Sequence, residues 1–120
     1  MLELLPDLPD HVVGIKAIGD VEGDDYEGVL VPAIRDRLGR HEKIRLLYVL
    51  GSEFEGYEAD AAWEDAKLGV RTFTSYERIA VVTDSVLIRR SVRAFAWLMP
   101  GETRVFPVGD LAVARAWIVA

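Results

Sequence analysis

Hydrophobic positions along this chain form two kinds of pattern, one typical of strands and one typical of helices, and the two kinds alternate. Short runs of β-branched and other apolar residues bounded by turn residues are typical of strands and occur at 2–5, 12–18, 44–50, 78–82 and 103–106. Apolar residues spaced three and four apart form one helix face and mark 23–39, 58–68, 85–99 and 111–119. The pattern therefore predicts the order β-β-α-β-α-β-α-β-α.

This order implies a largely parallel sheet, because right-handed crossover helices join parallel strands. No helix follows segment 2–5, so we expect that strand to pair antiparallel at an edge. Segment 44–50 is apolar on both faces after Arg45, which favours a central strand. We predict an α/β fold with a mixed, mostly parallel sheet of four to five strands, about four helices, and one domain over 1–120.

Pro32 lies inside the clearest predicted helix, 23–39. Proline removes one backbone hydrogen bond, and its ring crowds the preceding turn. We therefore predict a kink or a local loosening of the helix at this residue.

Composition narrows the function classes. The chain has no cysteine, which excludes disulfides, Cys-ligated metals and thiol nucleophiles. Lys and Arg number 14 and Asp and Glu number 20, so the net charge is −6. Acidic domains bind nucleic acid poorly, because the phosphate backbone supplies much of the affinity. No apolar run approaches the roughly 20 residues of a membrane span, and we expect a cytoplasmic protein.

Catalytic signatures are weak in this sequence. Ser52 follows a predicted strand, but the Gly-x-Ser-x-Gly pattern of a nucleophile elbow is missing. His11 and His41 precede strands, so a parallel sheet places them at the opposite end from Ser52. The acidic clusters lack the spacing of a calcium loop, and no glycine pattern cradles phosphate. We therefore expect that this protein is not an enzyme and that it binds no cofactor and no metal ion.

The predicted helix at 86–99 carries a basic ridge. Arg89, Arg93 and Trp97 are spaced four apart, with Arg90 adjacent, opposite an apolar face of Ile88, Val92, Phe95, Leu98 and Met99. Such a ridge fits an anionic lipid headgroup or an acidic partner. The alternative is a solvated helix back whose arginines pair with Asp84 or Glu102.

Three aromatic residues form the second candidate site. Phe54 and Tyr57 lie in an acidic loop that contains a glycine, and Trp63 follows on the predicted helix 58–68. In this position they can line a pocket between the sheet and the 54–68 segment. The alternative is that they simply belong to the core.

Several short motifs together resemble the SpoIIAA-like proteins, relatives of the STAS fold of anti-sigma-factor antagonists. The motifs are Asp25-Tyr26 with Pro32, Phe54-Glu-Gly56-Tyr57, Trp63-Glu-Asp65-Ala-Lys67, Arg78-Ile-Ala-Val-Val82 with Asp84, Phe106, and Ala114 with Trp117. The resemblance implies a mixed sheet with helices that can open over an apolar cavity. It also implies a phosphorylated serine after the third strand, which makes Ser52 a candidate phosphorylation site, although the Asp-Ser pair is absent here.

Two functions follow as expectations. The first is a non-enzymatic binding or regulatory module that docks on a protein partner or a membrane surface. The second is a carrier of a small apolar or lipid-like ligand. For either one we also expect homodimers, because small domains often cover exposed apolar surface in this way.

Overall fold

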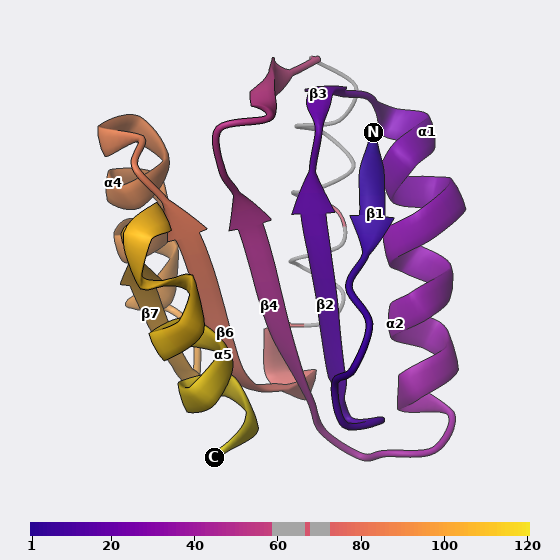
Figure 1. The fold of residues 1–120 in the computed structure, drawn as a ribbon. Coiled ribbons are helices and arrows are strands. Elements are labelled where there is room, and N and C mark those ends of the chain that lie inside the picture. Colours follow the sequence, from indigo (N-terminus) through magenta and orange to yellow (C-terminus); the bar gives the residue numbers. More distant parts are fainter. Residues whose placement is uncertain (59–66, 68–72) are drawn as a thin grey trace.

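The computed structural model describes residues 1–58, 67 and 73–120. Its main sheet has five strands in the order β1-β2-β4-β6-β7 (Figure 1). β2, β4, β6 and β7 are parallel, and β1 pairs antiparallel with β2 at one edge, as predicted. The strands are β1 Leu2–Leu4, β2 Val12–Ala17, β4 Ile44–Leu50, β6 Tyr76–Thr83 and β7 Glu102–Phe106.

The central position of β4 confirms the prediction from its composition. Every residue of β4 except Arg45 is buried, because β2 and β6 flank the strand and other elements cover both of its faces. Leu46, Tyr48 and Leu50 belong to one hydrophobic cluster, whereas Leu47 and Val49 belong to the other. The two clusters are therefore separated by the sheet.

The helices lie on the two faces unequally. They are α1 Gly23–Asp25 continued by a π-helical turn at Tyr26–Leu30 and by α2 Val31–Leu38, then α4 Val86–Ala96 and α5 Leu111–Val119. The crossovers from β2 to β4 and from β6 to β7 move the chain in the same direction across the sheet, so α1, α2 and α4 share one face. The cluster on that face includes Leu30, Ile34, Ile88 and Val92. α5 follows β7 and packs on the opposite face through Ala114 and Ile118 (Figure 1).

About four helices were predicted, and the described residues contain three when α1, the π turn and α2 are counted as one. The remaining predicted helix, 58–68, lies outside the described residues except at its first residue, Glu58, and at Lys67. The α/β class and the mostly parallel sheet are confirmed.

Pro32 follows a π-helical turn. The N–H of Val31 donates to the carbonyl of Tyr26, five residues earlier, where an α-helix pairs residues four apart. The widened turn immediately precedes the proline, which stands in the first turn of α2. This is the local loosening that the sequence predicted.

A second, two-stranded sheet was not predicted. β3 Gly19–Val21 pairs in parallel with β5 Phe54–Tyr57 beyond the carboxyl ends of β2 and β4. Gly19 has φ 61°, a left-handed conformation that favours glycine. The small sheet fixes the segment after β4, which carries Ser52, Phe54 and Tyr57.

Candidate functional site

α4 presents a basic surface, which we define as Arg89, Arg90, Arg93 and Trp97. The helix begins after Ser85, whose hydroxyl oxygen accepts a hydrogen bond from the N–H of Ile88 at 3.3 Å. All four residues of the α4 surface are exposed, and the Trp97 side chain is 87% exposed. The predicted ridge therefore lies on one accessible stretch of helix.

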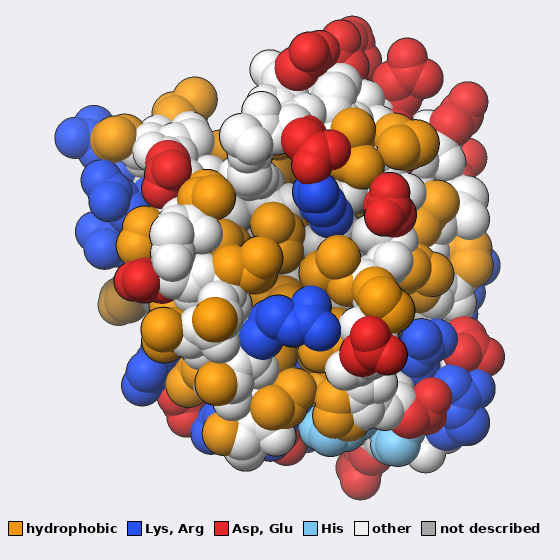
Figure 2. Space-filling model, viewed as in Figure 1, with side chains coloured by type: hydrophobic (Ala, Val, Ile, Leu, Met, Phe, Trp, Pro, Cys, Tyr) orange, Lys and Arg blue, Asp and Glu red, His pale blue; other side chains and the backbone are white. Residues whose placement is uncertain are grey.

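The arginines of the α4 surface carry no neutralising partner within the described residues. No ion pair joins Arg89, Arg90 or Arg93 to a carboxylate there, and the carboxylate of Asp84 instead accepts the N–H of Val108 at 3.0 Å. The alternative pairing with Asp84 or Glu102 is thus not found in the described part of the chain. Figure 2 shows basic side chains gathered over α4 and acidic side chains gathered near β3 and α1.

The predicted apolar face of α4 was partly wrong. Met99 is buried, and Ile88 and Val92 pack against the core. Phe95 is 40% exposed and Leu98 is 66% exposed, because the helix contacts the sheet through a narrower arc than its apolar residues span. Exposed apolar side chains therefore adjoin the α4 surface.

Phe54 and Tyr57 come together on β5. Their ring centroids are 5.2 Å apart, and Phe54 packs against the core while Tyr57 is 38% exposed. The Tyr57 hydroxyl donates to the Tyr48 hydroxyl at 2.8 Å, and Tyr48 and Tyr26 share a buried hydrogen bond of 2.9 Å. Trp63 lies outside the described residues, so the predicted ligand lining stays a prediction.

Ser52 is an exposed turn residue at the carboxyl end of β4. The turn closes through the Phe54 N–H, which donates to the Gly51 carbonyl at 3.1 Å. His41 precedes β4, and a seven-residue strand spans about 20 Å, so the structure does not bring Ser52 and His41 together. Whether Ser52 accepts a phosphate stays a prediction.

Sequence reasoning missed a cation near this turn. Lys16 on β2 forms an ion pair with Glu53, the residue after Ser52, and Glu53 raises the pKa of the Lys16 amine. The two residues are 37 positions apart, so only the strand pairing brings them together. The available signal was Lys16 itself, the one charged residue in the otherwise apolar segment 12–18, because a lysine in such a strand usually has a partner.

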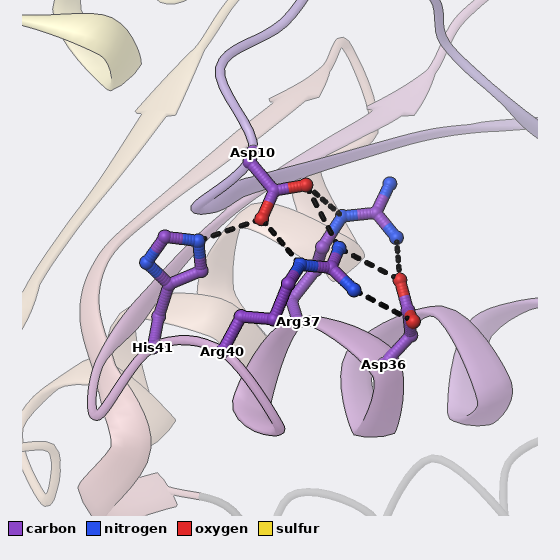
Figure 3. Close-up of polar contacts among 5 residues, drawn as sticks. All are labelled: Asp10, Asp36, Arg37, Arg40 and His41. Atoms are coloured by element: carbon purple, nitrogen blue, oxygen red, sulfur yellow. Dashed lines mark hydrogen bonds and ion pairs between the residues drawn. The ribbon is translucent and has the colours of Figure 1, made fainter.

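A polar cluster also forms at the opposite end of the sheet (Figure 3). The Arg40 guanidinium donates two hydrogen bonds of 2.8 Å to the Asp10 carboxylate, and His41 Nε2 lies 2.7 Å from Asp10 Oδ2. Asp36 accepts two bonds of 2.9 Å from the same Arg40 guanidinium. Arg37 also donates to Asp36 at 2.7 Å, so a carboxylate pairs with each of the two arginines and the cluster joins the loop before β2 to the end of α2.

The described residues contain no group of three His, Asp or Glu side chains placed to hold a metal ion. No helix among them is long and apolar enough to cross a membrane.

Comparisons with known proteins give a consistent result. A family model described as SpoIIAA-like matches residues 12–119. Among solved structures, the chain is similar to an uncharacterized protein of the DUF3478 family with a SpoIIAA-like fold from Shewanella loihica PV-4. The two are 27% identical with a TM-score of 0.77, and the match covers 98% of this chain and 92% of that one. No curated protein matches the chain.

Proposed function

Because the chain belongs to the SpoIIAA-like family, whose fold is that of binding and regulatory modules, we propose that it docks on an anionic membrane surface through α4. The observation that carries this proposal is the α4 surface, where an almost fully exposed Trp97 adjoins three arginines that form no ion pair within the described residues.

The chemistry of these side chains suits a membrane interface. Tryptophan prefers the headgroup region, because its ring is apolar and its N–H is polar. Each arginine near an anionic leaflet contributes about 1 kcal/mol of attraction. The exposed Leu98 beside Trp97 adds apolar surface that can enter the interface.

The charge of the remaining molecule favours a single orientation. The whole chain carries a net charge of −6, and acidic side chains gather near β3 and α1 (Figure 2). An anionic surface repels that end and attracts α4. Docking through α4 therefore leaves β3, β5 and the Tyr57 region facing solvent.

Vesicle cosedimentation tests the proposal directly. We expect the protein to bind phosphatidylglycerol vesicles and to leave phosphatidylcholine vesicles unbound. The double variant Arg89→Glu, Arg93→Glu should bind the anionic vesicles at least tenfold more weakly, because two attractive charges become repulsive. High salt should weaken binding of the wild type in the same assay.

The control reverses two exposed charges outside α4. Arg35 lies on α2, and Lys43 lies between α2 and β4, where its amine donates to the Thr74 carbonyl at 3.1 Å. Arg35→Glu with Lys43→Glu changes the net charge by the same amount. This control should retain most of the vesicle binding. An equal loss in both double variants, or no binding of the wild type, contradicts docking through α4 and leaves an acidic protein as the partner to test.

A carrier of a small apolar or lipid-like ligand is a second candidate function. It is favoured by the Tyr57 hydroxyl, which joins the buried Tyr48 at the margin of an apolar core. Native mass spectrometry before and after organic extraction tests it. An added mass that departs on extraction supports a carried ligand, and an unchanged mass counts against one.

A further inference from the structure

β7 forms one edge of the main sheet. The strand order ends with β7, and no further strand lies beyond it in the described part of the chain. Within that part, the backbone of Glu102–Phe106 forms no hydrogen bond apart from its ladder with β6. An edge of this kind presents free N–H and carbonyl groups that can pair with another strand.

β7 carries one acidic and one basic side chain, Glu102 and Arg104, on the same face of the strand. Glu102 and Arg104 are two residues apart, so they lie on the same face of the strand, on either side of Thr103. Both are exposed, and neither takes part in an ion pair among the described residues. The Arg104 guanidinium lies 5.0 Å from the centroid of the Trp117 ring, which places this face on the α5 side.

We propose that a second copy of this chain pairs antiparallel along β7, about a twofold axis at Thr103. In this register Glu102 of each copy lies directly opposite Arg104 of the other, so two identical ion pairs flank the axis. The same patch serves both copies, as a twofold interface requires. Opposite charges across an antiparallel pair stabilise it, whereas like charges oppose it.

The other sheet edge does not offer this complementarity. β1 contains only one charged residue, Glu3, between Leu2 and Leu4. A twofold axis at Glu3 places two carboxylates opposite each other, and no cation on β1 offsets them. Self-pairing is therefore favoured at β7 and disfavoured at β1.

The interface is expected to be small and concentration-dependent. One five-residue strand buries less area than the roughly 1,200 Å² of a standard stable interface. The connection from α4 to β7 adds to it, since Pro100 falls opposite Phe106 of the second copy and the exposed Leu98 lies two residues before Pro100. The dimer should therefore dissociate on dilution.

Pairing of this kind has a consequence for docking that rests on the proposed function. The twofold axis stands normal to the sheet, so the two copies keep the same faces on the same sides. Both α4 surfaces then lie on one side of a continuous sheet. A membrane that binds one copy binds the second at high effective concentration, which raises the overall affinity.

Sedimentation velocity over a range of protein concentrations tests the pairing. We expect a monomer–dimer equilibrium in the wild type. Glu102→Arg and Arg104→Glu should each weaken dimerisation by at least tenfold, because each sets like charges opposite each other. The double variant Glu102→Arg, Arg104→Glu should restore the dimer, because the swapped charges are complementary again.

Two controls separate pairing from folding. Glu3→Arg on β1 makes the same charge change at the other edge and should leave the dimer unaffected. Thermal melts of each variant check the fold, because Arg104→Glu also removes the contact with Trp117. Glu102→Arg does not alter that contact and keeps the test valid by itself.

A wild type that stays monomeric at every concentration overturns the proposal. So does a dimer that survives Glu102→Arg, or a double variant that stays monomeric. The proposed function fails in a different way: a variant with Arg89 and Arg93 replaced by Glu should still dimerise in solution while losing its vesicle binding.

Discussion

Asp10 is an exposed residue whose carboxyl pKa is lowered by its neighbours. Arg40 donates two hydrogen bonds to its carboxylate and is the main cause, with His41 second, and together they hold the pKa of Asp10 well below its ordinary value of 3.8. Arg40 likewise lowers the pKa of Asp36. The surface position allows solvent to screen these contacts, so the effect on folding is modest.

The lowered pKa of Asp10 gives stability a defined dependence on pH. The contribution is fully present above the ordinary value of 3.8 and is lost as the pH falls below it, because the unfolded chain takes up the proton first. Asp10→Asn should lower the melting temperature at neutral pH, and the gap from the wild type should narrow between pH 4 and the acid limit. Melting curves across this range measure the gap, and a gap independent of pH contradicts the assignment.

At the scale of an element, α4 is a helix held by few contacts. No residue of Val86–Ala96 is fully buried, so the start of the helix and its inner arc of Ile88 and Val92 carry its stability. The Ser85 side chain caps the first turn, and such a cap satisfies an N–H that the helix leaves unpaired. The helix that carries the proposed docking surface is therefore held by one cap hydrogen bond and a narrow apolar arc.

Ser85→Ala should destabilise the protein by about 1 kcal/mol, because the cap hydrogen bond to the Ile88 N–H is lost. Urea unfolding measures the change. Ser91→Ala is the matched control, since its hydroxyl only donates back to the Leu87 carbonyl at 2.9 Å and alanine is a better helix former. Equal losses in the two variants contradict a capping role for Ser85.

At the scale of the whole molecule, different helices cover the two faces of the main sheet. One described face has α1, α2 and α4, whereas α5 supplies Ala114 and Ile118 to the core of the other. Arginines on the strands reach its last turn: Arg45 donates to the Ile118 carbonyl at 2.9 Å and Arg78 to the Trp117 carbonyl at 2.8 Å. The positive charges of these two arginines stabilise α5, because the carboxyl end of a helix is the negative end of its dipole.

Ile118→Ala should destabilise the protein by about 2–4 kcal/mol, because Ile118 is fully buried and its loss leaves a cavity under α5. Val119→Ala is the neighbouring control. Its side chain is 41% exposed, and its loss should cost less than about 0.5 kcal/mol. Guanidinium unfolding compares the two, and similar costs contradict the packing of α5 described above.

The parts of the fold that the sequence predicted were those with local causes. Period and composition located the five main strands, the central place of 44–50 and the loosened helix at Pro32. The pairing of β3 with β5 was missed, because Asp20 and Glu55 are polar and the strands are only three and four residues long. Partners far apart in the chain, such as Asp10 with Arg40, were also missed, since only the folded sheet brings them together.

The late position of α5 in the chain has a consequence for folding. All five strands of the main sheet precede Leu111–Val119 in the chain, so a sheet that forms before α5 packs on it exposes the apolar side chains of Leu47, Val49, Ala80 and Val82. Exposed apolar strands of this kind promote aggregation. A variant in which α5 cannot pack against the sheet therefore presents one bare sheet face, and we expect it to aggregate more readily than the wild type.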